Sequence, residues 1–349
     1  MDFKTILTSW YSTNKRDLPW RKTQNPYFIW LSEIILQQTQ IKQGLPYYIA
    51  FTETFPSVFD LANATEDQVL KLWQGLGYYS RARNLHASAK FIAFELNGIF
   101  PDNYKDLLKL RGVGDYTASA IASICFGEPK AVVDGNVYRV LSRYFGITTP
   151  INTTKGVKEF KTLAMELMDF KNPGNYNQAI MDFGSRQCKP KNPNCNLCPL
   201  RNSCIALSQN KIDELPVKIR TAKAKVKYFN FLVFISNNGK TRLEKRTTKG
   251  IWQNLYQFPL IESNQPLCYR DLKNNQDIKN ILNTEDYNVF LYNSDTIIHK
   301  LSHQHLHTKF WIIETQDLRG KNVVDIASIQ KYPVPILIGN FLDEFNFNI

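Results

Sequence analysis

The chain has 349 residues, of which 43% are hydrophobic, and a formal net charge of +12. This length exceeds that of one ordinary hydrophobic core, so we expect two domains. No apolar run approaches the roughly 20 residues of a membrane span, and the N-terminus lacks a signal-peptide pattern, so we expect neither membrane insertion nor export. The cationic surplus favours a polyanionic partner, most often nucleic acid, although solubility alone is the simpler interpretation of charge.

Residues 1–210 are predicted to form a mainly helical domain, because apolar residues recur there at the spacing of one helix face. The pattern covers residues 28–41, 66–78, 81–96, 104–110, 116–126 and 157–169. Glycine and proline separate these runs. Thr65, followed by two acidic residues, is typical of a helix N-cap.

The first of these runs contains Glu33 among apolar residues at three- and four-residue spacing. Such neighbours predict partial burial, and burial raises the pKa of a carboxylic acid because its ionised form loses hydration. Glu33 is therefore a candidate general acid. For this residue taken alone, an ordinary surface glutamate is the more common case.

The stretch LRGVGDYTASAI, residues 110–121, places two glycines between two helical runs. Glycine permits close approach of another backbone, and the following helix start offers free N–H groups at its positive end. Gly112, Val113 and Gly114 are thus predicted to bind a phosphate without reading base sequence. An ordinary turn between two helices is the alternative.

Further along the chain, Asp134 precedes Gly135 and Asn136 at the start of another apolar helix. An aspartate in this place is typical of a helix N-cap. A carboxylate that caps a helix can also act on a substrate, so the two roles do not exclude each other.

Four of the six cysteines fall within 17 residues, with the spacing Cys188-x6-Cys195-x2-Cys198-x5-Cys204. In a chain without an export signal, this crowding favours a metal centre over disulfides. Iron–sulfur and zinc are both chemically suitable occupants, but zinc ribbons usually pair two short C-x2-C knuckles.

The composition changes after residue 210. Residues 211–227 are predicted to be a basic linker, because they are polar, rich in lysine and weakly periodic. Residues 228–349 are predicted to form an α+β domain that begins with a hairpin turning at Asn237-Asn238-Gly239. Strands are also predicted at NVFLYN, residues 288–293, and HTKFWIIE, residues 307–314.

Taken together, these motifs and their order resemble the MutY family of adenine DNA glycosylases, within the helix-hairpin-helix glycosylases that carry a [4Fe-4S] cluster. The motifs are LPWR (18–21), SEIILQQTQ (32–40), GLGYYSRARNLH (75–86), RGVGDYTASAI (111–121), VDGNVYRVLSR (133–143), NQAIMDFGSRQC (177–188) and the cysteine array. The resemblance is specific through residue 207. It continues more loosely through GIWQNLYQFP (250–259) and LSHQHLH (301–307).

The resemblance implies a catalytic helix-hairpin-helix domain with a [4Fe-4S] cluster on the four cysteines, and a C-terminal Nudix-like domain that recognises 8-oxoguanine. It implies that Glu33 protonates adenine and that Asp134 stabilises the sugar cation, with Asn136 orienting groups nearby. The implied adenine pocket contains Trp20, Arg21 and Asp182. The implied partner is double-stranded DNA with an 8-oxoguanine:A mispair, bound by a monomeric cytoplasmic enzyme at the bacterial nucleoid.

For the DNA, the resemblance implies that Tyr78 wedges beside the damaged base and that Gln38 fills the stack. The implied 8-oxoguanine contacts are Leu301, Ser302 and His303, where Leu301 replaces the phenylalanine usual in the family. The Nudix-like domain lacks the glutamate-rich metal cluster of working Nudix hydrolases after Gly250, so we do not expect it to hydrolyse nucleotides. A metal site at the alternating histidines of residues 303–307 is a weaker alternative.

Two other functions compete with adenine removal. An endonuclease III-type lyase would need a lysine just after the hairpin to form a Schiff base, and this chain has Tyr116 there. A DNA-binding protein without catalysis would not need both Glu33 and Asp134. We therefore expect a glycosylase that removes the base by water and leaves the strand intact.

Overall fold

The computed structural model describes residues 2–219, 224–273, 275–282 and 287–347. The chain divides into two compact units. Unit 1 contains residues 1–63 and 84–220, and unit 2 contains residues 64–83 and 221–349. Residues 220–223 of the predicted linker 211–227 lie outside the described residues, and the first strand of unit 2 begins at Lys225.

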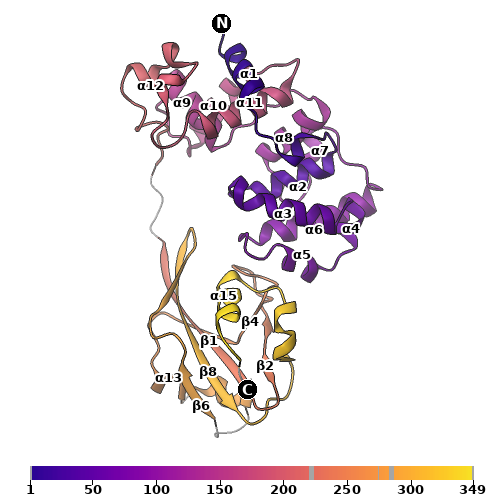
Figure 1. Ribbon diagram of the computed structural model, residues 1–349, viewed down its shortest axis with the longest axis vertical. Coiled ribbons are helices and arrows are strands. Elements are labelled where there is room, and N and C mark those ends of the chain that lie inside the picture. Colours follow the sequence, from indigo (N-terminus) through magenta and orange to yellow (C-terminus); the bar gives the residue numbers. More distant parts are fainter. Residues whose placement is uncertain (1, 220–223, 274, 283–286, 348–349) are drawn as a thin grey trace. The chain divides into compact units, whose positions relative to one another are not determined.

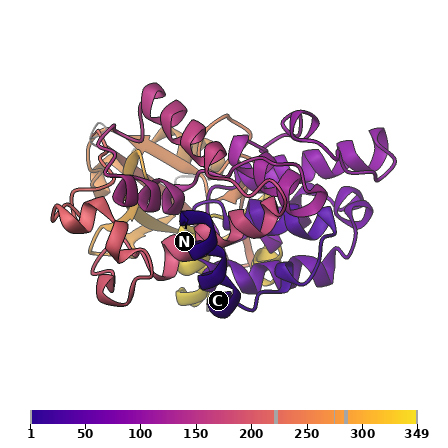
Figure 2. The same ribbon diagram turned by 90° about the horizontal axis from the view of Figure 1, so that it is seen from above.

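Unit 1 is helical, as the periodicity predicts (Figure 1). Its longer helices are α1 (Phe3–Asn14), α2 (Pro26–Leu36), α3 (Ile41–Thr54), α6 (Ser80–Lys90, with its first turn in unit 2), α8 (Asp115–Phe126), α9 (Gly135–Phe145), α10 (Thr154–Glu166) and α11 (Pro173–Arg186). Short helices are α4 (Val58–Asn63), α7 (Tyr104–Leu107) and α12 (Ile205–Ser208). α1, α8 and α9 all pack on α11. Figure 2 shows α1 as the indigo helix that begins beside the N label.

The core under α9 and α11 is strongly apolar. Val137 and Leu141 of α9 pack there with Phe160 of α10 and Phe183 of α11. Burial of such side chains contributes roughly 1.5–3 kcal/mol each, which fixes α9 and α11 relative to each other. The candidate site residues on these helices thus stand on a rigid support.

Helix starts follow the capping chemistry in the sequence. Thr65 forms a complete capping box with Gln68 at the start of α5 (Glu66–Leu72). Asp134 accepts hydrogen bonds from the backbone N–H groups of Asn136 and Val137 at the start of α9. The helical run expected over 66–78 ends at Leu72, because Gly75, Gly77 and Tyr78 adopt positive φ angles that a helix cannot contain.

The centre of unit 2 is a mixed sheet of five strands. β1 (Lys225–Ser236) and β8 (Gln304–Thr315) pair in parallel along their whole length. β5 (Leu260–Ser263) flanks β1, while β6 (Asn288–Leu291) and β7 (Ile297–Lys300) pair antiparallel with β8. The strands predicted near 288–293 and 307–314 are confirmed.

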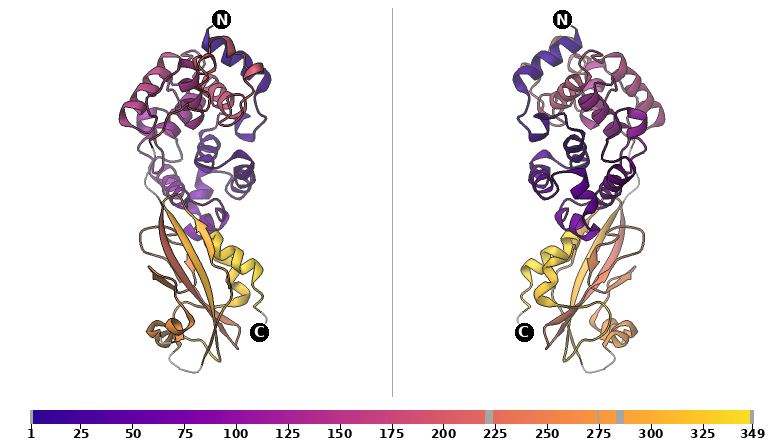
Figure 3. Two further views of the ribbon diagram at one scale, coloured as in Figure 1. Left: turned by 90° about the vertical axis from the view of Figure 1, so that its left-hand side faces the viewer. Right: turned by 90° about the vertical axis from the view of Figure 1, so that its right-hand side faces the viewer.

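Helices cover both faces of this sheet (Figure 3). α15 (Ile336–Glu344) covers one face, where Phe341 stacks on Phe310 at 4.2 Å between ring centroids. α13 (Tyr269–Lys273) and α14 (Gln276–Leu282) cover the other, with Leu272 and Ile278 packed beside Trp311. Successive residues of β8 therefore point into different cores, as the alternation of a strand requires.

The prediction of a hairpin at the start of unit 2 is correct for the turn but wrong for the pairing of the second strand. The turn at Asn237-Asn238-Gly239 exists, with Gly239 at φ +73°. However, β2 (Lys240–Arg242) pairs with β9 (Val323–Asp325), and β3 (Glu244–Lys245) pairs with β4 (Tyr256–Gln257). Turn chemistry is local, whereas the choice of a strand partner depends on distant residues that the pattern does not show.

Among the described residues, none of the helices is long and apolar enough to cross a lipid bilayer.

Candidate active site

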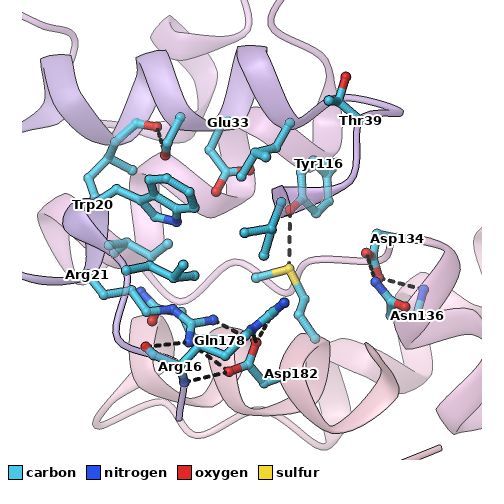
Figure 4. A pocket seen from close by; sticks show the side chains of 17 residues that line it. Arg16, Trp20, Arg21, Glu33, Thr39, Tyr116, Asp134, Asn136, Gln178 and Asp182 are labelled. Atoms are coloured by element: carbon cyan, nitrogen blue, oxygen red, sulfur yellow. Dashed lines mark hydrogen bonds and ion pairs between the residues drawn. The ribbon is translucent and has the colours of Figure 1, made fainter. Parts of the chain in front are cut away.

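A cavity of about 170 Å³ lies in unit 1 among α2, α8, α9, α11 and the short turn Pro19–Arg21 (Figure 4). Its wall brings together all seven residues that the sequence indicated for catalysis and for the adenine pocket. These are Trp20, Arg21, Glu33, Tyr116, Asp134, Asn136 and Asp182. They come from five separate stretches of the chain, so the fold, and not sequence proximity, assembles them.

Glu33 occupies the middle of α2 and faces the cavity (Figure 4). Burial raises the pKa of its carboxyl from 4.5 to about 7, because the ionised form loses hydration among apolar neighbours such as Ile29 and Leu36. A hydrogen bond with Tyr116 and the charge of Arg21 oppose this rise, and the charge of Asp134 adds to it. Near neutral pH the acid and its carboxylate are therefore both populated.

Asp134 serves as the N-cap of α9 and lines the same cavity. One carboxylate oxygen accepts the N–H groups of Asn136 and Val137, each at 2.8 Å, and the other accepts the Asn136 Nδ2 at 2.8 Å. Burial raises the pKa of Asp134, while these hydrogen bonds oppose the rise by favouring the ionised form. Asn136 thus holds the carboxylate in a fixed orientation.

Asp182, on α11, forms another part of the cavity wall. Its side chain is fully buried and accepts hydrogen bonds from Arg21 Nη1 and Nη2, both at 2.7 Å, and from Arg16. Burial alone would raise the pKa of Asp182, but the hydrogen bonds and charges of the two arginines outweigh it and lower the pKa. Asp182 therefore stays ionised while the nearby Glu33 takes up a proton.

Tyr116 stands where the lyase alternative would place its amine. Its hydroxyl donates to the Met181 Sδ at 3.2 Å and lies beside Glu33. Burial, followed by the charge of Glu33, raises the pKa of Tyr116, so its phenol stays neutral. A neutral phenol can pack and hydrogen-bond, but it cannot form a Schiff base.

Sequence reasoning missed several residues of this wall. Arg16 and Gln178 both line the cavity, and Gln178 Oε1 accepts the Tyr11 hydroxyl at 2.7 Å. Gln178 lies one helical turn before Asp182 on α11, a spacing that could have indicated it. Arg16 had no comparable signal, because its partner Asp182 is 166 residues away.

The glycine turn before α8 is tied to the helix that carries Glu33. Gly112 has φ +79°, and Gly114 is the N-cap of α8 without a side-chain cap. Gln37, just after α2, donates from its Nε2 to the Gly112 carbonyl at 3.3 Å and to Thr117 Oγ1 at 3.2 Å. The first N–H groups of α8 are left for an external acceptor, and Gln38 is exposed at φ +56° beside the turn.

The four clustered cysteines are partly exposed and form no disulfide. Burial raises the pKa of Cys198 to about 11, and the charges of the other three cysteines add to the rise, which shows that the thiols share one neighbourhood. Arg143 braces the loop by donating to the carbonyls of Lys189 at 2.7 Å and Pro190 at 3.1 Å. Among the described residues, no three His, Cys, Asp or Glu side chains are gathered as the ligands of a single metal ion would be.

A second, larger cavity of about 580 Å³ lies wholly within unit 2. The turn that contains Tyr78 forms one side, and Leu301, Ser302 and His303 form another. Tyr78 is 50% exposed and adopts φ +47°. The structure therefore brings the expected wedge and the expected recognition residues into one pocket.

The same pocket contains Trp252 and His299, which the sequence did not indicate. Their ring centroids lie 5.8 Å apart, and Trp252 has φ +58°. Burial lowers the pKa of His299, so its imidazole is neutral near pH 7. The pocket thus offers an apolar aromatic wall with hydroxyl and imidazole groups at its rim.

Two family models match the chain. Residues 31–166 match the HhH-GPD superfamily of base excision DNA repair proteins, and residues 230–344 match the NUDIX domain. Both matches agree with the predicted mainly helical domain followed by an α+β domain, which confirms the expected fold class.

Curated relatives match over most of the chain. An adenine DNA glycosylase of Buchnera aphidicola subsp. Acyrthosiphon pisum is 35% identical, covering 99% of this chain and 98% of the relative. The one from Buchnera aphidicola subsp. Baizongia pistaciae is 38% identical, covering 89% and 86%. The human adenine DNA glycosylase is 41% identical over 61% of this chain and 41% of its own length.

Among solved structures, a thermostable thymine-DNA glycosylase matches with a TM-score of 0.55 at 30% identity, covering 59% of this chain and 95% of the other. An endonuclease III in a non-covalent complex with DNA matches with a TM-score of 0.52 at 22% identity, covering 59% and 94%. The second likeness shows the fold alone.

Proposed function

This chain belongs to the adenine DNA glycosylase family of base excision repair, and we propose that it acts on adenine paired with 8-oxoguanine, and also with guanine. The observation that carries this proposal is the cavity of unit 2, where Tyr78 and Leu301–His303 line a space of about 580 Å³. The glycosidic chemistry belongs to the other cavity, in unit 1. Specificity for the opposite base and cleavage are therefore assigned to separate sites.

The target adenine must leave the duplex to reach the cavity of unit 1, which costs a few kcal/mol of unstacking. Tyr78 is suited to wedge beside the damaged base, because its ring is half exposed on a turn. Trp20, Arg21 and Asp182 form one side of the receiving cavity. Asp182 cannot act as the acid there, because the two arginines keep it ionised.

Glu33 is the general acid in this proposal. It donates its proton to a ring nitrogen of adenine, the C1′–N9 bond breaks, and the bond electrons leave with the base. The Asp134 carboxylate, held by Asn136, stabilises the positive charge that develops on the sugar. The Glu33 carboxylate then accepts a proton from water while the water oxygen bonds to C1′, which restores the acid.

Tyr116 makes the enzyme monofunctional in this proposal. The lyase reaction requires an amine that attacks C1′, and the group beside Glu33 at this position is a neutral phenol. The product is therefore an intact strand with an abasic site.

DNA is proposed to approach unit 1 at the turn formed by Gly112, Val113 and Gly114 and at the first N–H groups of α8, with Gln38 beside them. These contacts bind the phosphate backbone and carry no sequence information. We further propose that the enzyme is a monomer and that it works at the nucleoid.

The four cysteines are proposed to hold a [4Fe-4S] cluster. Soft thiolates in one neighbourhood, next to the cationic Arg143, suit such a group. The cluster would supply a rigid centre for the loop Cys188–Cys204 and no step of the hydrolysis. A visible absorption band at about 400 nm in the purified protein would support it, whereas a colourless protein with bound zinc would contradict it.

The proposed substrate is tested with matched duplexes that contain A:8-oxoguanine, A:G or A:T at one position. Single-turnover release of adenine should be fastest opposite 8-oxoguanine, slower opposite guanine and absent opposite thymine. Strand breaks should appear only after alkali. Equal rates opposite 8-oxoguanine and guanine would overturn the specificity, and breaks without alkali would overturn the monofunctional assignment.

A further inference from the structure

Residues 64–83 lie inside the HhH-GPD match, yet they form one compact unit with the C-terminal sheet. This segment consists of α5, the turn with Gly75 and Tyr78, and the first turn of α6. The contacts that hold it in unit 2 can therefore set the position of Tyr78.

Two neighbouring carboxylates at the start of α5 make one set of these contacts. Asp67 accepts the Lys245 Nζ at 2.7 Å and the Tyr256 hydroxyl at 3.1 Å. Glu66 accepts the Asn254 Nδ2 at 2.6 Å. We call Glu66, Asp67, Lys245, Asn254 and Tyr256 the acidic anchor.

The other end of the segment is also fixed to the C-terminal part of unit 2. Arg83 donates from its Nη1 to the Gln253 carbonyl at 2.8 Å, and Tyr79 donates its hydroxyl to the Val334 carbonyl at 3.3 Å. Gln253 and Asn254 follow Trp252, which lines the same cavity as the Tyr78 turn. The anchor and the Arg83 contact thus connect two of the segments that line this cavity.

The turn between these two ends has an unusual backbone. Gly75, Gly77 and Tyr78 all have positive φ angles, and for a tyrosine this conformation is costly. Such a backbone persists only where the surroundings over-determine it. Within the segment, Trp73 Nε1 donates to the Gly77 carbonyl at 3.1 Å and Arg81 donates to the carbonyls of Leu76 and Gly77. The acidic anchor and the Arg83 contact in turn hold the two ends of the segment against the rest of unit 2.

We propose that Glu66 and Asp67 are positioning residues, through which the C-terminal domain holds the Tyr78 turn against the Leu301–His303 side of the cavity. The anchor couples recognition of the base opposite adenine to the placement of the wedge. This consequence rests on the proposed function, whereas the mechanical coupling does not.

The first test uses the full-length protein and weakens the acidic anchor by substitutions outside α5, so that this helix itself is unaltered. Lys245→Met removes the ammonium and keeps the length of the side chain, and Asn254→Gly removes the amide at a position with φ +65°. Amide hydrogen exchange of residues 74–80 is measured without DNA, with residues 225–236 of β1 as the internal reference. Exchange of the turn should rise at least fivefold in the double variant, and that of β1 should stay unchanged.

A second double variant, Glu66→Gln with Asp67→Asn, removes the carboxylates from the α5 side. The matched control is Asp317→Asn, which removes an exposed ion pair with Arg319 in the same unit. The two anchor variants should behave alike and the control should match the wild type. Faster exchange only in the α5-side variant would overturn the proposal, because lost helix-dipole stabilisation of α5 would then explain it.

Excision provides a second readout that a merely structural role would not change. In the anchor variants the ratio of single-turnover rates for A:8-oxoguanine over A:G should fall at least threefold, with the rate on A:G unchanged. Unchanged turn exchange would overturn the coupling, and faster exchange with an unchanged ratio would overturn its role in recognition of the opposite base. If the wild type itself does not discriminate, the proposed substrate is wrong, and the exchange of the turn still decides the coupling.

Discussion

Burial of Glu33 favours catalysis at neutral pH but lowers the stability of the folded protein there. Burial gives its carboxyl a pKa of about 7, which suits a general acid at neutral pH. The same burial disfavours the ionised form, so the folded protein binds a proton more tightly than the unfolded chain does. The linked stability is therefore greatest below the unfolded pKa of 4.5 and falls as the pH rises toward 7.

Glu33→Gln should separate these two effects. Excision should fall by about 10²–10⁴-fold because the acid is lost. At pH 8 the variant should be more stable than the wild type, by at most about 3 kcal/mol, because no buried carboxyl has to ionise. Single-turnover excision measures the loss of the acid, and urea unfolding at pH 5 and pH 8 measures the change in stability. An equal stability difference between variant and wild type at the two pH values would contradict the link between Glu33 ionisation and stability.

The pH dependence of the wild-type rate follows from the same carboxyl. Donation requires protonated Glu33, so adenine release at saturating enzyme should decline as the pH rises through about 7. The decline should follow one titrating group in single-turnover measurements between pH 5.5 and 9. A rate that increases over this range would assign the acid to another group.

Asp134 also has two roles, and these can be separated by substitution. Asp134→Asn retains a good N-cap for α9 but removes the charge, so stability should change by less than about 1 kcal/mol. Excision should nevertheless become undetectable, because the sugar cation loses its carboxylate. Asp134→Ser provides a second capping residue as the control, and activity retained in either variant would leave only the structural role.

At the scale of elements, substitutions in the turn before α8 can separate an effect on the stability of the fold from an effect on DNA binding. A Cβ on Gly112 would lie 2.8 Å from the Asn84 Cβ, and φ is +79° there, so Gly112→Ala should destabilise the fold by about 1–2 kcal/mol. A Cβ on Gly114 would meet no atom within 4 Å, and φ is −96°. Gly114→Ala should therefore leave stability nearly unchanged.

DNA affinity should respond differently from stability at these two glycines. The added methyl of Gly114→Ala obstructs the approach of a phosphate to the N–H groups of α8, so binding should weaken about 10-fold. Fluorescence anisotropy with a duplex and thermal unfolding measure the two properties. Unaltered DNA affinity in Gly114→Ala would remove this turn from the interface.

The sequence predicted the locally determined parts of the site well. The apolar spacing around Glu33 indicated its burial, and the residue types at Thr65 and Asp134 indicated their caps. It missed the pairing of β2 with β9 and the Arg16–Asp182 contact, because both depend on residues far apart in the chain. It also missed α3, whose interior Gly44 and Pro46 suggest a break.

At the scale of the whole molecule, residues 64–83 group with the C-terminal sheet. The sequence could not predict this grouping, because it depends on contacts between residues far apart in the chain. Helical periodicity shows that α5 exists, but not which core it joins. The contacts of Asp67 with Lys245 and Tyr256 span more than 170 residues. A family boundary drawn along the sequence therefore need not be a boundary in the folded chain.

The net charge of +12 predicts how the whole protein binds DNA. Cations that replace counterions on phosphates make affinity fall steeply with salt and without regard to sequence, by roughly 10³-fold between 50 and 200 mM for about six contacts. In the proposed function, discrimination between A:8-oxoguanine and A:G instead depends on the uncharged groups of the unit 2 cavity. The affinities for both duplexes should therefore fall with the same slope, and their ratio should stay constant.

Equilibrium binding of the Glu33→Gln protein to both duplexes, measured from 50 to 300 mM salt, checks this separation because that variant leaves its substrate intact. An A:T duplex of the same length should show the same slope at lower affinity. If the preference for 8-oxoguanine disappears as salt rises, recognition of the opposite base depends on charge. Lys300, a cationic residue of the same pocket wall, would then be the group to test.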